Sequence, residues 1–110
     1  MDGGGNGAKK MQFVNCTPHV IRLNSGEEFP PSGNIARVTS SYEEISPGIF
    51  RVEFGEVTGL PDPKPWVQYI VSAMVAGATS RMDVVVPATG HPECIRKDGQ
   101  VYAVPGFIAK

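Results

Sequence analysis

Glycine and proline residues divide this chain into short apolar runs. The 110 residues include 13 Gly and 10 Pro, spread along the chain without a repeat. Gly adopts the positive φ angles of tight turns, and Pro lacks the backbone N–H that a sheet ladder needs. The spacing therefore predicts strands joined by turns within one folded domain.

The charge balance argues against several classes of partner. Charged residues make up 19% of the chain and the net charge is −1, whereas nucleic-acid-binding domains usually carry a basic face. No apolar run is long enough to cross a bilayer, and no apolar signal segment opens the sequence. We therefore expect no nucleic-acid and no membrane partner. Two cysteines, Cys16 and Cys94, fit free thiols in the reducing cytoplasm.

The N-terminus differs in composition from the rest of the chain. Residues 1–10 are rich in Gly and are expected to be a disordered tail, with a single globular domain at residues 11–110. Within that domain the clearest strand is at residues 49–55. There, apolar side chains alternate with Arg51 and Glu53 in the two-residue period of a half-buried strand.

One short helix is expected at residues 72–79, where apolar side chains recur at helical spacing and Ser72 can act as N-cap. Apolar runs at residues 69–71 and 83–86 flank this helix and would complete a βαβ-like unit. The Asp-Gly pair at residues 98–99 predicts a type I′ hairpin. Together these patterns predict an α+β fold, a mostly antiparallel bent sheet or small open barrel with this one helix.

Several motifs occur together along the chain. They are N-x-T-P-H at residues 15–19, P-S-G-x-x-A-R-V at 31–38, G-E-V-x-G-L-P at 55–61, Y-I-V-S at 69–72 and R-x-D-V-V-x-P at 81–87. In this combination the chain resembles a family of small, largely uncharacterised proteins of bacteriophages and bacteria. The resemblance implies a small intracellular protein of phage or mobile-element type. It implies no catalytic residue and no cofactor.

Polar and basic residues within or near these motifs suggest a ligand site. Arginine forks suit phosphate and carboxylate groups, and loops with Ser and Gly offer backbone N–H groups to an anion. The sequence contains no nucleotide-binding fingerprint. We hypothesise a site for a small anionic, nucleotide-like metabolite formed by six residues: Thr17, His19, Ser32, Arg37, Arg81 and Arg96.

Two alternatives use the histidines. Cys16-x-x-His19 and His91-x-x-Cys94 supply the two short Cys/His pairs of a tetrahedral zinc site, although Cys16 stands where the similar family usually has an apolar residue. A small hydrolase would instead use His19 or His91 as the base for a nucleophile such as Ser72. The Gly-x-Ser-x-Gly elbow that presents such a serine is absent from the sequence.

A host protein is the other partner that fits the pattern. A Pro-rich loop at residues 60–65 ends at Trp66, and aromatic anchors are frequent in interfaces, although Trp66 also fits the core at the start of a strand. Edge strands leave homodimer formation by strand pairing open. We therefore expect a non-enzymatic, cytoplasmic binding or accessory protein whose partner is a host protein or a small anionic metabolite.

Overall fold

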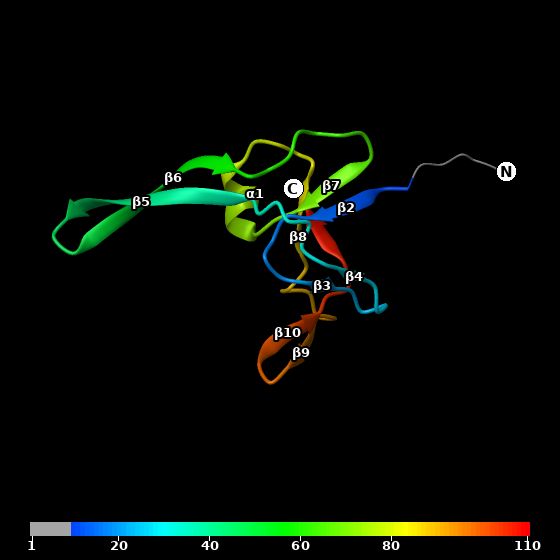
Figure 1. The fold of residues 1–110 in the computed structure, drawn as a ribbon. Helices are drawn as coiled ribbons and strands as arrows, with labels where there is room; N and C mark the ends of the chain where they lie inside the picture. The colour runs from blue at the N-terminus through cyan, green and yellow to red at the C-terminus, as the bar shows by residue number, and fades with distance from the viewer. Residues whose placement is uncertain (1–9) are drawn as a thin grey trace.

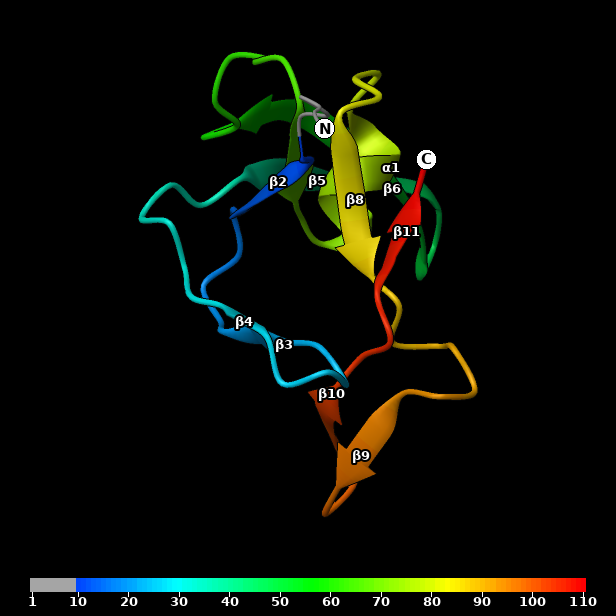
Figure 2. The same cartoon turned by 90° about the vertical axis from the view of Figure 1, so that its right-hand side faces the viewer.

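The centre of the protein is a four-stranded sheet, seen in a computed structural model that describes residues 10–110 (Figures 1 and 2). The strand order is β11-β8-β7-β2. Strands β2 and β8 run parallel to β7, and β11 runs antiparallel to β8. The four strands are β2 (Gln12–Asn15), β7 (Val67–Ile70), β8 (Val84–Pro87) and β11 (Phe107–Ala109).

Helix α1 (Ala73–Ala78) connects β7 to β8. Its N-cap is Ser72, whose Oγ accepts a hydrogen bond from the Val75 N–H at 3.3 Å, and the Thr79 N–H closes the last turn. A helix of six residues is not stable alone in water, so the burial of Val75 and Ala76 in the core holds it in place. The predicted short helix and the parallel strand pair beside it are both confirmed.

Apolar side chains pack on both faces of the central sheet. On one face Val84, with no exposed surface, belongs to the main core cluster, and Val14 of β2 packs against that cluster. Successive side chains of a strand point to opposite faces, so Phe13 points to the other face. There its ring contacts those of Phe29 and Phe107, with centroids 5.8 and 4.8 Å away.

Two small hairpins extend from this centre. They are β3 (Ile21–Arg22) with β4 (Glu28–Phe29), and β9 (Ile95–Lys97) with β10 (Gln100–Ala103). Between β9 and β10, Asp98 and Gly99 have φ angles of 54° and 78°. Positive φ at both central residues is the geometry of a type I′ turn, so the hairpin predicted from the Asp-Gly pair is confirmed.

A third hairpin, β5 (Arg37–Ser46) with β6 (Ile49–Thr58), projects from the centre (Figure 1). At its base, Val38 and Val57 pack against the core cluster. Beyond an irregularity in the pairing between Val38 and Ser40, the ribbon leaves the core. We call the projecting part, residues 40–54, the arm.

The β-rich architecture with one short helix agrees with the sequence analysis, but one bent sheet or open barrel does not. The strands of residues 10–110 form four separate sheets, and none of these sheets closes into a barrel. The strand expected at residues 49–55 is present, yet its side chains are exposed, and within the described part of the chain it pairs only with β5. The tail expected at residues 1–10 lies outside the described residues, apart from Lys10.

Within residues 10–110, no helix is long and apolar enough to cross a membrane.

Candidate functional site

The N-x-T-P-H motif builds a hydrogen-bonded turn around a buried asparagine. Asn15 is 2% exposed. Its Nδ2 donates to the carbonyl oxygens of His19 and Phe29 at 2.7 and 2.8 Å, and its Oδ1 accepts from the N–H and Oγ1 of Thr17 at 2.9 and 2.7 Å. Every polar group of the Asn15 amide therefore has a partner inside the protein. The motif, including the predicted site residue Thr17, holds three segments of the chain together.

The P-S-G motif is tied to the same strand. Ser32 donates from both its Oγ and its N–H to the Asn15 carbonyl oxygen, at 2.7 and 2.9 Å. Next to it, Cys16 is only 1% exposed. Burial raises the pKa of the Cys16 thiol, and a hydrogen bond with Ser32 offsets part of this effect. A neutral, enclosed thiol is a poor nucleophile, so Cys16 and Ser32 act here as structural groups.

The predicted site residue Arg81 is held by an internal ion pair. Its Nε and Nη2 donate to the two carboxylate oxygens of Asp83 at 3.0 and 2.6 Å, and its guanidinium lies 5.6 Å from the centre of the Tyr69 ring. The hydrogen bond from Arg81 lowers the pKa of Asp83. Asp83 therefore takes one edge of the Arg81 guanidinium and balances its charge, which ties this residue to the chain itself.

The remaining predicted residues lie in different places. Thr17 and Arg37 line one pocket of about 250 Å³, and His19 lines another of about the same volume. Arg96 donates to the Thr89 carbonyl oxygen at 3.2 Å on an exposed part of the chain. The structure therefore brings Thr17 and Arg37 together but does not gather the six residues around one ligand.

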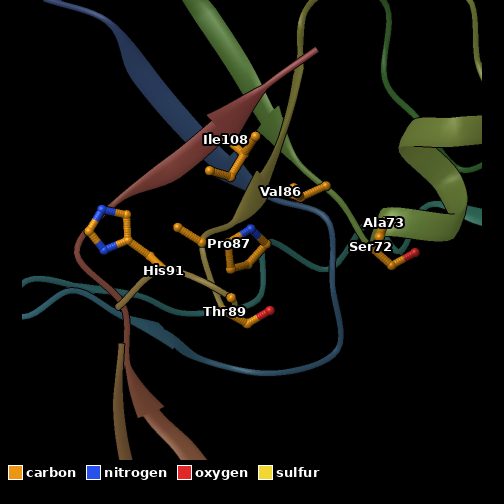
Figure 3. A pocket seen from close by; sticks show the side chains of 9 residues that line it. Ser72, Ala73, Val86, Pro87, Thr89, His91 and Ile108 are labelled. Atoms are coloured by element: carbon orange, nitrogen blue, oxygen red, sulfur yellow. The ribbon is translucent and has the colours of Figure 1, made fainter. Parts of the chain in front are cut away.

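A further pocket of about 550 Å³ lies where α1, β8 and β11 meet (Figure 3). It contains a serine and a histidine, Ser72 and His91, which lie on opposite sides of Pro87. The Ser72 Oγ accepts from the Val75 N–H, and the His91 Nδ1 accepts from the Glu93 N–H at 3.0 Å. Among residues 10–110, no Ser, Thr or Cys side chain is hydrogen-bonded to a histidine ring, so this pocket lacks an assembled hydrolase pair.

The structure does not assemble the ligands of the zinc alternative. Within the described residues, no three His, Cys, Asp or Glu side chains lie close enough together to hold a metal ion. Cys16 is buried in the core, whereas Cys94 is partly exposed and His19 and His91 are both exposed. The two Cys/His pairs are local loop features that the fold leaves apart.

The most unusual surface of the molecule is on the arm. Residues that are opposite each other on β5 and β6 point to the same face of the ribbon, so the apolar side chains of the two strands lie together. The apolar face of the arm consists of Tyr42, Phe50, Val52 and Phe54, which are 45–72% exposed. The opposite face is polar and includes Glu43 and Arg51, an exposed ion pair at 3.5 Å. The arm is therefore an amphipathic ribbon whose apolar face is not covered by any of residues 10–110.

The sequence pattern identified the part of this apolar face that β6 contributes, but not the part from β5. The alternation at residues 49–55 identified Phe50 and Phe54 as one face of a strand, but it assigned that face to the core. Tyr42, from the other strand, packs edge-on against Phe50 with ring centroids 6.5 Å apart. No pattern marked Tyr42, because single aromatic residues in polar stretches are common. Trp66 is 51% exposed with a φ of 64°, so it does not fill the core.

Comparisons of the chain with protein-family models, with curated proteins and with solved structures give no match. A proposal about function therefore depends on the geometry of the described residues and on the sequence motifs.

Proposed function

We propose that the chain is a non-enzymatic accessory protein of phage or mobile-element type that works by holding another protein against the apolar face of its arm. The observation that carries this proposal is an amphipathic ribbon with three exposed aromatic side chains, Tyr42, Phe50 and Phe54. Aromatic anchors at the centre of an interface contribute most of the binding energy in many complexes. The two free cysteines fit the reducing cytoplasm in which we place the protein.

The stability of the arm supports the proposal. A two-stranded hairpin is at best marginally stable in water unless it packs against a further strand or helix. In the part of the chain that the structure describes, this ribbon packs on the core at its base, through Val38 and Val57. The outer part, residues 40–54, gains that support when another protein covers its apolar face. Exposed apolar patches of a few hundred Å² on soluble proteins commonly mark such interaction sites.

A matched pair of variants tests the proposal. Phe50→Ser with Phe54→Ser removes apolar anchors from one face of β6, and Arg51→Ser with Glu53→Ser changes the opposite face of the same strand. The tagged full-length chain is recovered from cells that also express a second, differently tagged copy, and all retained proteins are identified by mass spectrometry. We expect the wild type and the polar-face variant to retain a protein that the apolar-face variant loses. Equal retention by both variants contradicts the proposal.

A second candidate function is suggested by the pocket that His19 lines. Beside it, the Arg22 Cζ and the Lys97 Nζ lie 4.4 and 3.6 Å from the centroid of the Tyr102 ring. Arg22 lines this pocket of about 250 Å³ but is paired with Glu28 at 2.6 Å. The charge offered to a small organic anion therefore comes from Lys97, beside the Tyr102 ring that also lines the pocket. Titration calorimetry with adenosine monophosphate tests this role, because binding should weaken at least tenfold in Lys97→Ala. Absence of heat with the wild type would remove this candidate.

A further inference from the structure

We infer that the protein held by the arm is a second copy of this chain, and that the apolar faces of two arms pack against each other around a two-fold axis. This inference deepens the proposed function and rests on it. Its structural basis is the apolar face formed by Tyr42, Phe50, Val52 and Phe54.

The first reason is that the arm needs a permanent cover. An amphipathic two-stranded ribbon in water exposes its apolar side chains and gains little stability from its own hydrogen bonds. A partner that binds only at certain times would leave residues 40–54 uncovered for most of the life of the protein. A second copy is present whenever the chain is present, and closed two-fold dimers are the commonest oligomers of soluble proteins.

The second reason is the area of the surface. Tyr42, Phe50 and Phe54 are 72%, 57% and 53% exposed, and an aromatic side chain presents about 150–250 Å², so roughly 350 Å² of aromatic surface is open. Val52, which is 45% exposed, adds roughly 50 Å². Two arms face to face would bury roughly 800 Å², which is below the standard interface size and fits a dimer that dissociates on dilution.

The third reason is that the face is self-complementary when the arms run in opposite directions. The strand register places Phe54 opposite Ser40 near the base, Val52 opposite Tyr42 in the middle and Phe50 opposite Glu44 near the tip. In an antiparallel pair the middle rows meet at the two-fold axis. Phe54 of each copy then packs against Phe50 of the other copy. Each row therefore contributes one aromatic side chain to the contact.

The core decides between antiparallel and parallel arms. Along β5 the side chain of Val38, which packs on the core, points to the same face as Tyr42 because alternate residues share a face. The core therefore stands on the apolar side of the ribbon at its base. Parallel arms would bring the two cores together at one end, whereas antiparallel arms put them at opposite ends, each beside the tip of the other arm.

Most charged side chains of the arm lie on the face that this packing leaves in water. Glu43, Arg51 and Glu53 lie on the opposite face of the ribbon in both copies. Glu44 lies opposite Phe50 on the apolar face, so its carboxylate, which accepts a hydrogen bond from the Gly48 N–H at 3.1 Å, would stand at the margin of the contact. This face-to-face contact also differs from the edge-to-edge strand pairing that the sequence left open, and it leaves the strand edges unused.

Sedimentation velocity of the full-length chain and its two double variants tests the inference. At about 50 µM we expect a dimer for the wild type and for Arg51→Ser/Glu53→Ser. The dissociation constant of Phe50→Ser/Phe54→Ser should rise at least tenfold, which leaves it monomeric. Circular dichroism confirms that each variant is folded, which is expected because the substituted side chains are exposed. A dimer of unchanged strength in the apolar-face variant overturns the inference.

Crosslinking tests the position of the axis, in a background of Cys94→Ser that leaves only the buried Cys16. Val52→Cys should form an intermolecular disulfide on mild oxidation, whereas Glu53→Cys, on the opposite face, should not. Equal crosslinking at both positions overturns the face-to-face arrangement. A monomeric wild type also overturns the inference. In that case the proposed function stands if the apolar-face variant still loses a different retained protein, and falls with the inference if no retained protein depends on that face.

Discussion

The core and the arm contain strands with apolar side chains in opposite environments. In β7, three of four residues are buried, and Ile70 has no exposed surface at all. In β6, apolar residues alternate with charged ones, and the strand is exposed over almost its whole length. Alternation therefore specifies that a strand has an apolar face. It does not specify whether that face is covered by the same chain or by another chain.

The largest expected difference between the two regions is the cost of truncating an apolar side chain. Ile70→Ala should lower the free energy of unfolding by about 4 kcal/mol, because it opens a cavity in a fully packed site. Phe54→Ala, at a position that is 53% exposed, should cost the monomer less than about 1 kcal/mol. Urea denaturation at low protein concentration measures both values. Similar costs for the two variants would show that the arm is packed on its own core.

The next difference concerns buried and exposed hydrogen bonds. Asn15→Ala should cost about 3 kcal/mol, because it leaves the partners of four hydrogen bonds around Thr17, His19 and Phe29 without their amide. Glu44→Ala removes one exposed hydrogen bond at the arm tip and should cost less than about 0.5 kcal/mol. Thermal unfolding of the two variants checks the pair. A loss below about 1 kcal/mol for Asn15→Ala would contradict a structural role for the motif.

Two glycines with similar φ angles differ in the space around them, so replacing each by alanine distinguishes backbone strain from a steric clash. Gly59, where the arm rejoins the core, has a φ of 81°, and a Cβ there would collide with the Ile35 carbonyl oxygen. Gly48, at the arm tip, has a φ of 77° and open space around it. Gly48→Ala should cost about 1 kcal/mol of backbone strain, and Gly59→Ala roughly 2 kcal/mol more. Equal costs would mean that the junction is as loose as the tip.

The smallest difference is electrostatic. Arg81 lowers the pKa of Asp83 through their hydrogen bonds, so this pair stabilises the fold above the unfolded pKa of Asp, about 3.9. That contribution is lost as the pH falls through the lower folded pKa. Asp83→Asn should cost roughly 1 kcal/mol at pH 7, and the difference should shrink below about pH 4. Glu43→Gln, in the longer and more exposed arm pair, should change stability by less than about 0.3 kcal/mol. A loss for Asp83→Asn that stays the same at acid pH would contradict this assignment.

Local signals in the sequence predicted the parts of the fold that depend on local chemistry. The helix beside Ser72 and the turn at residues 98–99 were found because capping and positive φ are properties of a few neighbouring residues. The parallel unit around the helix followed from the apolar runs on either side. The separation of the arm from the core could not be predicted, because it depends on which surfaces meet in three dimensions.

The candidate site was less predictable for the same reason. Thr17, Ser32 and Arg81 belong to motifs, but the structure uses them to hold Asn15, β2 and Asp83. A motif shows that residues occur together and does not show whether they bind a ligand or the chain itself. The apolar face of the arm depends on the register of β5 against β6, which brings Tyr42 beside Phe50, and sequence spacing alone does not fix that register.

Hydrogen exchange followed by mass spectrometry, over a dilution series of the unmodified chain, tests the central claim most directly. It compares amides in the arm, residues 40–54, with amides of the core strand β7. We expect core exchange to be slow at every concentration, and arm exchange to be slow at high concentration and faster on dilution, because another chain covers the arm. Arm exchange that stays slow at every concentration would contradict this claim, since it would mean that the arm is stable without a partner.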